Sequence, residues 1–326
     1  MDYSRIIGID DDAKKFLDEF LSDSVDVTAH TSGSTGKPKA IKLKKSDMRL
    51  SARSTNQFFG INDQSILVSP LSCRYIAGMM MVVRAIESNS HLLFEKPSNA
   101  PLSAGRYLKT IDLLPVVPSQ ISGLLDNVGR NGLTVRNVIV GGAPMSMKME
   151  QMLRESGINS YATYGMTETC SHVALRSILR NEDYFTALPG VKFSVDDDCR
   201  LLIHRNSAEV KTLHTNDVVR LLGDTRFVWV GRYDNVINSG GIKIHPEEIE
   251  RQLHPVMGNR TFYITSRSSE KWGEEVVMVV ERDDELNVKD LMCQIKAMVG
   301  VKAPKEMIFV DAVERTSNGK IVRIKL

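Results

Sequence analysis

A loop rich in glycine, hydroxyl and lysine side chains is the first part of the sequence that could do chemistry. Residues 31–39, TSGSTGKPK, hold two glycines, four hydroxyl groups and two lysines. Glycines let backbone N–H groups approach an anion closely, and hydroxyl groups add further donors. The sequence therefore predicts a phosphate-binding loop, with a mobile polar hairpin as the alternative.

This loop does not have the pattern of the P-loop ATPases. That pattern requires a glycine five positions before Gly36, where Thr31 stands, and a serine or threonine after Lys37, where Pro38 stands. The class of phosphate chemistry therefore depends on the other motifs in the chain.

Four further polar segments follow the loop in order. They are YGMTE (164–168), TND (215–217), GRYDNVINSGGIKIHPEEIE (231–250) and RTSNGKIVR (315–323). Together with the loop, they resemble the ordered motifs of the adenylate-forming superfamily of acyl-CoA synthetases, peptide-synthetase adenylation domains and luciferases. The resemblance extends over residues 31–323, which is nearly the whole chain.

The resemblance implies an ATP-dependent acid–thiol ligase that works in two steps. A carboxylate attacks the α-phosphate of ATP, giving an acyl-adenylate and pyrophosphate, and a thiol, usually that of coenzyme A, then displaces AMP. Because the first step brings two anions together, it needs charge neutralisation by donors and Mg²⁺. ATP, Mg²⁺, coenzyme A and a small carboxylic acid are therefore the expected partners.

The nucleotide-binding roles follow from the resemblance residue by residue. Tyr164 is expected to stack on adenine and Thr167 to contact the α-phosphate. Glu168 is expected to hold Mg²⁺, because a hard cation prefers carboxylate oxygen. An aromatic core residue and an exposed glutamate are the alternative. The other expected ATP and AMP contacts are Thr31, Ser32, Gly33, Ser34, Thr35, Gly36, Lys39, Gly141, Gly142, Ala143, Gly165, Asp217 and Arg232.

Two of these assignments have plain structural alternatives. GGAP, residues 141–144, would form the wall beside adenine and the acyl group, or only a turn between a strand and a helix. Asp217 and Arg232 would hold the ribose hydroxyls, since a carboxylate can accept two such bonds. Otherwise Asp217 would be a turn residue ahead of the following strand.

The last two motifs imply a mobile C-terminal domain. Asp234 is the expected hinge, at which this domain rotates between the two half-reactions. Lys320 is expected to neutralise charge between the carboxylate and the α-phosphate during adenylation, unless it is an ordinary surface lysine. In the other orientation, Gly240, Gly241 and Lys243 would face the nucleotide and coenzyme A, with room for the pantetheine arm at Gly241.

The acyl substrate is suggested by one longer segment. Residues 164–176, YGMTETCSHVALR, look most like the o-succinylbenzoate–CoA ligases of menaquinone synthesis. That substrate has two carboxylates, and the one that does not react needs a cationic or hydroxyl partner. Arg74, Ser171 and His172 are the expected partners, with Arg176 as a further candidate. A cap on an apolar stretch for Arg74 and a core histidine for His172 are the alternatives.

Other functions stay open because a fold does not fix a substrate. They are an aryl- or fatty-acid–CoA ligase, an enzyme that charges a carrier protein, and a non-catalytic nucleotide-binding relic. The loop begins at residue 31, whereas relatives have a longer preceding region, so we expect a subdomain to be absent or reduced. Asn216 replaces the usual glycine of TGD, where asparagine should tolerate a left-handed turn. His30 replaces a residue that is often aromatic.

The strands and helices that position these residues are predicted from short apolar runs that alternate with helical patterns. Strands are predicted at SILVSP, HLLFE, DLLPVVP and VRNVIVGG, and helices at 75–88, 119–126 and 146–156. This alternation predicts an α/β fold with layered, mostly parallel sheets. Before it, we expect a helix over 13–21, the strand VDVTAH, and a helix that is capped by Ser46 and ends at Gly60.

The pattern changes after about residue 190. The closely spaced runs KFSVD, RLLIH, VKTL, DVVRLL and FVWVG predict a β-rich subdomain, and GRYDNVINSGG a linker. A small α+β domain should follow, with helices 246–253 and 288–298 and strands 260–265, 275–281 and 306–310. We therefore predict an AMP-binding domain over 1–233 and a mobile C-terminal domain over 234–326.

Composition indicates which class of protein this is and in which compartment it is expected to work. Its 326 residues are 42% hydrophobic and 25% charged, which is typical of a soluble globular protein with a sizeable core. A net charge of +2 gives no case for nucleic acid or a membrane surface. The apolar run YIAGMMMVV is too short to span a bilayer, and the start lacks a secretory stretch. Four cysteines without CxxC spacing predict reduced thiols in the cytoplasm, and a homo-oligomer stays open.

Overall fold

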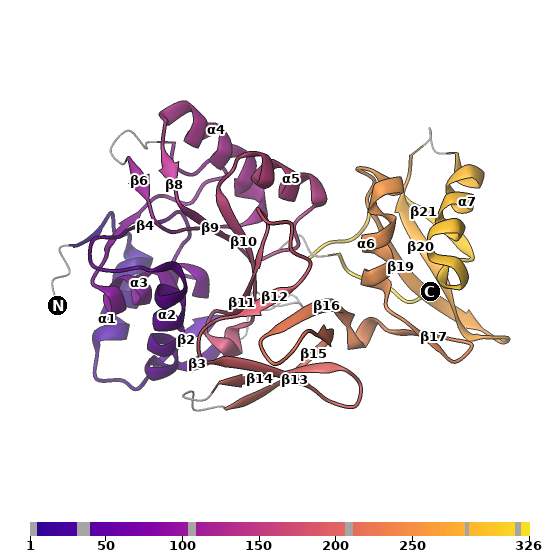
Figure 1. The fold of residues 1–326 in the computed structure, drawn as a ribbon, viewed down its shortest axis with the longest axis horizontal. Helices are drawn as coiled ribbons and strands as arrows, with labels where there is room; N and C mark the ends of the chain where they lie inside the picture. The colour runs from indigo at the N-terminus through magenta and orange to yellow at the C-terminus, as the bar shows by residue number, and fades with distance from the viewer. Residues whose placement is uncertain (1–4, 31–39, 104–108, 206–210, 284–286, 317–320) are drawn as a thin grey trace. The chain divides into compact units, whose positions relative to one another are not determined.

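The computed structural model describes residues 5–30, 40–103, 109–205, 211–283, 287–316 and 321–326 (Figure 1). Its internal contacts divide the chain into two compact units. The first unit holds Met1–Phe193, Ile203–Leu213 and Leu222–Phe227, and the second holds Ser194–Leu202, His214–Leu221 and Val228–Leu326. The functional boundary between residues 233 and 234 stays a prediction.

Parallel sheets build the first unit. One sheet is β1-β5-β4, all parallel, with bounds Ile6–Ile7, His91–Phe94 and Ile66–Ser69. In the larger sheet β7 (Leu114–Val116), β9 (Asn137–Val140) and β10 (Asn159–Gly165) are parallel neighbours. The strands β11 (His172–Ser177) and β12 (Phe185–Ala187) extend it in antiparallel pairing. The predicted α/β fold with mostly parallel sheets is confirmed.

Two small sheets and five helices also belong to the described part of the first unit. β2 (Asp26–His30) pairs with β3 (Ala40–Lys44), and β6 (Thr110–Ile111) with β8 (Thr134–Val135). The helices are α1 (Asp11–Leu21), α2 (Lys45–Phe59), α3 (Ile76–Ser88), α4 (Ile121–Asn131) and α5 (Met147–Glu155), with short 3-10 turns η2 (Pro118–Gln120) and η3 (Thr167–Thr169). α3 is buried on all sides from Gly78 to Ile86, as its continuous apolar sequence dictates.

The start of α2 differs from the prediction, whereas its end agrees. The helix begins at Lys45 rather than after Ser46, and Lys44 at its N-cap makes no side-chain cap bond. The N–H of Lys45 instead donates to the carbonyl of Val25 at 3.0 Å, so the residue that precedes β2 satisfies it. The last helical residue is Phe59, and the C-cap is the expected Gly60, whose φ of 66° suits glycine.

The β-rich region is confirmed, with one correction. β13 (Val191–Val195), β14 (Arg200–Arg205), β15 (Thr212–Leu221) and β16 (Arg226–Arg232) are neighbours in chain order, and their residues are shared between the units. The runs VKTL and DVVRLL, predicted as separate strands, meet in the single strand β15. Asn216 lies inside this strand, so the left-handed turn expected there is absent.

The C-terminal part of the second unit is a five-stranded sheet covered by helices. Its sheet order is β18-β17-β20-β19, and β21 adds in parallel to β20. The strands are β17 (Ile237–Ser239), β18 (Ile242–Ile244), β19 (Phe262–Ser269), β20 (Gly273–Glu281) and β21 (Glu306–Val310). The helices are α6 (Pro246–Met257) and α7 (Val288–Val299), with 3-10 turns η4 (Tyr233–Asn235) and η5 (Gly300–Lys302). The predicted small α+β arrangement is therefore confirmed.

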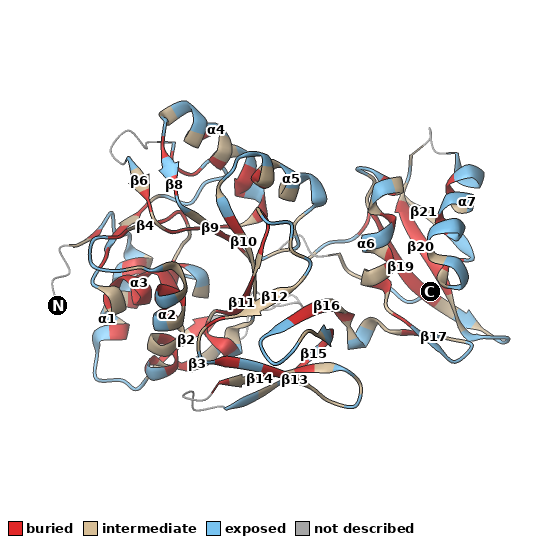
Figure 2. Cartoon of the chain, viewed as in Figure 1, coloured by how far each residue is buried: buried red, intermediate tan, exposed pale blue. Residues whose placement is uncertain are grey.

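Its core and its first hairpin explain this arrangement. Buried residues follow β19 and β20 (Figure 2) and pack against Ile249 of α6 and Ile295 of α7. The segment NVINSGG, predicted as linker, instead contains β17, which pairs with β18. Gly240 and Gly241 form the two-residue turn, with φ of 58° and 81°. Two positive φ values in sequence are what a tight type I′ hairpin requires.

Two further findings concern the chain as a whole. None of the described helices combines the length and apolar character needed to cross a membrane. All four cysteines are free: Cys73 and Cys170 are buried, and Cys199 and Cys293 are exposed. Burial raises the pKa of the Cys73 and Cys170 thiols to about 12, so both stay protonated and unreactive.

Candidate active site

The carboxyl ends of the parallel strands in the first unit meet at a cavity of about 350 Å³. Val117 follows β7, Gly141 and Gly142 follow β9, and Thr163 and Gly165 belong to the end of β10. In open α/β sheets, ligands bind at this edge, outside the carboxyl ends of the strands. The cavity is therefore the candidate active site of the first unit.

Two glycines after β9 bring the backbone close to the cavity. A β-carbon at Gly141 would lie 2.5 Å from the Thr163 hydroxyl, and Gly142 has a φ of 85°. Ala143 is half-buried and does not line the cavity, and the chain then reaches Ser146, which caps α5. The GGAP segment is thus both a cavity wall and a strand-to-helix turn. Its contact with adenine stays a prediction.

The YGMTE segment leaves β10 through a bulge and enters the turn η3. The register shifts between Tyr164 and Gly165, and Thr167 lines the cavity. Glu168 is exposed beside it. The Tyr164 ring packs against Phe185 and Phe227 at centroid distances of 5.7 and 5.1 Å, so the ring belongs to an aromatic cluster.

Sequence analysis missed Thr169, which holds this turn together. Its fully buried hydroxyl accepts from the N–H of Met166 at 2.9 Å and lies 2.6 Å from the carbonyl oxygen of Ser171. The hydroxyl therefore ties the start of the turn to the strand that follows, and so fixes Thr167 at the cavity. The sequence signal that could have identified Thr169 is its position two residues after Thr167 of the YGMTE motif.

A second residue that sequence analysis missed is Arg84 of α3. Its side chain lines the cavity and is only 2% exposed. Nη2 of Arg84 donates to Oγ of Ser171 at 2.7 Å. A lone arginine inside the apolar helix IAGMMMVVRAIES was the signal that could have identified it.

Ser171 and His172 continue from Arg84 as a hydrogen-bonded chain. Oγ of Ser171 lies 3.3 Å from Nδ1 of His172, whose Nε2 lies 3.3 Å from Oγ1 of Thr55. Thr55 donates its own hydroxyl to the carbonyl of Ser51, so Nε2 must donate and Nδ1 must accept. Burial and the charge of Arg84 lower the pKa of His172 well below its usual value, so the ring is neutral.

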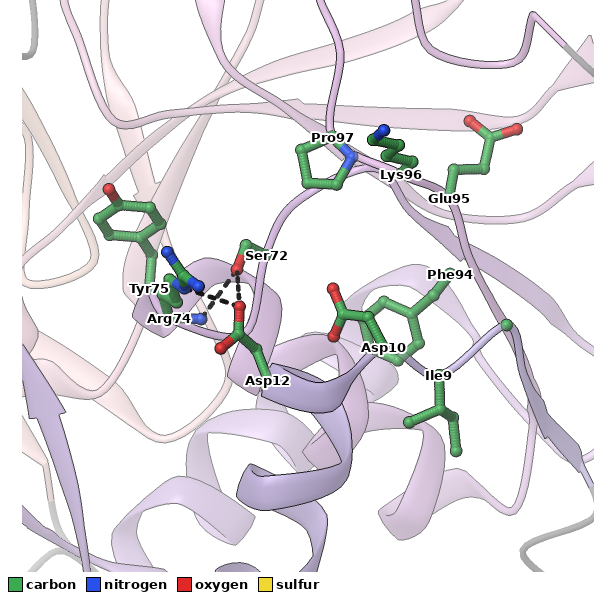
Figure 3. Close-up of a pocket in the computed structure, with 11 residues that line it drawn as sticks. Ile9, Asp10, Asp12, Ser72, Arg74, Tyr75, Phe94, Glu95, Lys96 and Pro97 are labelled. Atoms are coloured by element: carbon green, nitrogen blue, oxygen red, sulfur yellow. Dashed lines mark hydrogen bonds and ion pairs between the residues drawn. The ribbon is translucent and has the colours of Figure 1, made fainter.

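Arg74 lies elsewhere in the first unit. It lines a separate cavity of about 630 Å³ (Figure 3), where its Nε pairs with Asp12 at 2.7 Å. Its side chain is 74% exposed. The structure therefore does not bring Arg74 together with Ser171 and His172. Arg176, the further candidate, pairs with Glu150 at 2.5 Å.

The second unit brings three predicted residues together. The buried carboxylate of Asp217 accepts from the indole of Trp229 at 3.1 Å. Arg232 lies between two carboxylates, with Nη1 3.6 Å from Asp217 and Nη2 3.0 Å from Asp234. Asp217 lies inside β15, so it is not the turn residue of the alternative. Its role toward ribose and the hinge role of Asp234 stay predictions.

The hairpin β17–β18 places the expected coenzyme A residues. A β-carbon at Gly240 would lie 2.7 Å from the Trp272 ring, whereas one at Gly241 would meet nothing within 4 Å. Nζ of Lys243 pairs with Asp198 at 3.1 Å, and this hydrogen bond raises the pKa of the lysine. The role of Gly241 toward a ligand arm stays a prediction.

The remaining predicted contacts lie outside the described residues. They are Thr31, Ser32, Gly33, Ser34, Thr35, Gly36, Lys39 and Lys320.

Comparisons with solved structures support the described architecture. An acyl-CoA synthetase (AMP-forming)/AMP-acid ligase II-like protein from Dyadobacter fermentans DSM 18053 is 32% identical, with a TM-score of 0.65 over 95% of this chain and 91% of that one. O-succinylbenzoate coenzyme A synthetase (MenE) from Bacillus subtilis, in complex with ATP and magnesium ion, gives a TM-score of 0.75 at 20% identity, over 91% and 69% of the two chains.

Sequence comparison agrees with this likeness. A 2-succinylbenzoate–CoA ligase of Bacillus cereus (strain ATCC 10987) is 24% identical over 95% of this chain and 71% of the relative. One of Listeria monocytogenes serotype 4b (strain F2365) is 25% identical over 99% and 74%. The family model for AMP-binding enzymes matches residues 12–208, more than half of the chain and all the elements that line the cavity. The chain therefore belongs to the AMP-binding enzyme family.

Proposed function

We propose that the protein is an o-succinylbenzoate–CoA ligase of menaquinone biosynthesis. One carboxylate of the substrate attacks the α-phosphate of ATP, which forms the acyl-adenylate and releases pyrophosphate. The thiol of coenzyme A then displaces AMP and forms the thioester. The observation that carries this proposal is that Gly141, Gly142 and Thr167 line one cavity in a chain of the AMP-binding family. Its relatives' names supply the acid.

The described residues suit the proposed nucleotide and metal. Gly142 presents open backbone to the cavity, as a flat ring requires. The exposed carboxylate of Glu168 stands next to Thr167, and Mg²⁺ is held through one or two carboxylates together with substrate phosphates. Bound Mg²⁺ would neutralise phosphate charge as the carboxylate approaches. Thr167 would orient the α-phosphate at the cavity.

The setting of the reaction is part of the proposal. We place the protein in the cytoplasm, because all four of its cysteines are free and reduced thiols are typical there. Its partners are then ATP, coenzyme A and the small acid. A homo-oligomer is compatible with this chemistry.

Pyrophosphate release from Mg·ATP tests the function directly. The acids are o-succinylbenzoate, benzoate, a medium-chain fatty acid and a set of amino acids, each with and without coenzyme A. The proposal predicts strong turnover with o-succinylbenzoate that depends on coenzyme A. Turnover with another acid would keep the chemistry and discard the substrate, in favour of an aryl- or fatty-acid ligase or a carrier-charging enzyme.

Lys320→Ala separates the ligase from a nucleotide-binding relic. If Lys320 neutralises charge during adenylation, its loss should lower pyrophosphate release by about 10²–10³-fold while ATP binding is largely kept. Lys325→Ala is the matched control, because Lys325 also lies near the chain end but pairs with Glu274 on the surface. Unchanged release by the Lys320 variant would remove this lysine from the mechanism.

A further inference from the structure

Within the second unit, helix α6 is fastened to the strand that precedes the predicted hinge. Nη1 of Arg251, on α6, donates to the carbonyl of Trp229 at 3.0 Å, and Nη2 donates to the carbonyl of Val230 at 3.0 Å. Both carbonyls belong to β16. The predicted hinge, Asp234, lies between β16 and α6 in the chain. A rotation at this hinge would therefore move α6 relative to β16 and break both bonds.

The residue that Arg251 contacts also belongs to the proposed nucleotide site. The guanidinium lies over the Trp229 ring, with Cζ 5.8 Å from the ring centroid. The indole N–H of Trp229 donates to the buried carboxylate of Asp217 at 3.1 Å. Asp217 is the residue that we expect to hold the ribose of ATP. Trp229 thus connects the expected ribose site to α6.

Helix α6 also approaches β16 closely at Gly231. A β-carbon at Gly231 would lie 2.4 Å from Oε2 of Glu247, which belongs to the first turn of α6. The other carboxylate oxygen of Glu247 accepts from Nδ2 of Asn235, the residue after the predicted hinge, at 2.5 Å. The contact of α6 with β16 is therefore made by backbone and side-chain groups on both sides of the hinge.

Lys243 indicates which orientation these contacts belong to. Its Nζ pairs with Asp198, between β13 and β14, at 3.1 Å. Lys243 is expected to face the nucleotide and coenzyme A while the thioester forms, and a lysine held by Asp198 does not fit that role. The Arg251 bonds therefore suit the other orientation, in which the acid is adenylated.

We propose that Arg251 is a positioning residue that holds the C-terminal domain in the orientation for adenylation. Its bonds to Trp229 and Val230 break when the domain turns to form the thioester. This inference rests on the proposed function and on the hinge at Asp234. The planar fork of a guanidinium donates to two carbonyl groups at once, which an ammonium group does not match. Because both bonds are exposed to solvent, their net strength is small enough for them to break and re-form.

Two native cysteines allow the orientation to be measured directly. Cys199, between β13 and β14, and Cys293, on α7, are exposed and lie on opposite sides of the hinge in the chain, whereas Cys73 and Cys170 are buried. Spin labels on the two exposed thiols give a distance distribution by pulsed electron paramagnetic resonance. Arg251→Met should shift the populations toward a second distance by roughly 5-fold, as expected when one or two exposed hydrogen bonds are lost.

The two half-reactions give a second readout, which a purely structural role would not move. Single-turnover pyrophosphate release without coenzyme A measures adenylation. Mixing the enzyme-bound acyl-adenylate with coenzyme A then measures thioester formation. Arg251→Met should lower the ratio of the first rate to the second by roughly 5-fold. Arg251→Lys should lower it less, because the charge is kept without the fork.

Arg260→Met is the matched control. Arg260 donates to Asp283 at 2.6 Å and to the carbonyl of Met257 at 3.3 Å, so its bonds stay on one side of the hinge. This variant should keep the distances and the ratio of the wild type. If Arg251→Met does not fold, Arg251→Gln, which retains one donor group, takes its place.

The outcomes separate the inference from the function beneath it. A distance distribution of Arg251→Met identical to that of the wild type, or an equal fall in both half-reactions, would overturn the role of Arg251 and leave the ligase intact. Absence of turnover by the wild type with every acid would overturn the proposed function. The distances between the labels would then still decide whether Arg251 holds α6 on β16.

Discussion

At the scale of single residues, Gly165 leaves no room for any side chain. A β-carbon there would lie 2.4 Å from the carbonyl oxygen of Ser171 and 2.6 Å from Cα of His172. These are backbone atoms, so the cavity wall itself would have to move. Gly165→Ala should destabilise the protein by about 1–3 kcal/mol and lower adenylation. Chemical unfolding and pyrophosphate release measure the two effects.

Gly129 provides the control for that substitution. It lies in α4 with nothing within 4 Å of an added β-carbon and is exposed. Because alanine is favoured over glycine in a helix, Gly129→Ala should stabilise the protein by about 0.5–1 kcal/mol. Equal stability effects at the two glycines would show that the close approach at Gly165 has no energetic consequence.

The neutral state of His172 predicts a dependence of stability on pH. The pKa of the folded residue is lowered from 6.5 by burial and by Arg84, so the unfolded chain binds more protons below that pH. The free energy of unfolding should therefore fall as the pH drops below about 6.5, by at most about 1.4 kcal/mol per pH unit. Stability measured at pH 7 and 5.5 should show a smaller fall for His172→Gln.

Two other histidines should also make the free energy of unfolding fall as the pH drops. Burial also lowers the pKa values of His245 and His254, which belong to the second unit. Their contribution is the same in the wild type and in the variant, so it cancels in the comparison. An identical fall in both proteins would mean that His172 is protonated in the folded state.

At the scale of elements, the hairpin β17–β18 depends on its two glycines for different reasons. Alanine at Gly241 has only the cost of a positive φ, about 1–2 kcal/mol. Alanine at Gly240 has this cost and also meets the Trp272 ring. Gly240→Ala should therefore destabilise the protein more than Gly241→Ala. Thermal unfolding of both variants checks the order.

Trp272→Ala is the background that isolates the ring contact. In that background the two glycine variants should become equally stable, because only the backbone cost remains. A difference that survives removal of the ring would place its cause elsewhere in the hairpin.

At the scale of the whole molecule, the C-terminal part has its own hydrophobic core. The buried residues that form it run from Ile237 to Met307, with Phe309 packed against them, so all lie within the predicted domain 234–326. Expressed alone, residues 234–326 should fold and unfold cooperatively in denaturant. Met278→Asp, at a fully buried position, should abolish the transition. Non-cooperative behaviour of the unmodified fragment would show that the boundary is misplaced.

Local patterns were enough for most elements of this chain. The apolar sequence of α3 and the runs that became β4, β5, β7 and β9 were predicted because burial on all sides leaves a continuous apolar signal. The capping of α2 was predicted wrongly, because the N–H of Lys45 at the start of this helix donates to the carbonyl of Val25, twenty residues away. The hairpin at Gly240 and Gly241 was missed although its Gly-Gly signal is local.

The sequence by itself determined the family, the order of most elements, and the residues at the ends of the parallel strands. These follow from motifs and periodicities that are contiguous in the chain. Only the tertiary structure decided which cation belongs to the cavity. Arg74 and Arg84 are ten residues apart, yet one pairs with Asp12 at another cavity and the other is buried beside Ser171. The direction of a side chain depends on the turn of its helix and on distant neighbours, which no local pattern encodes.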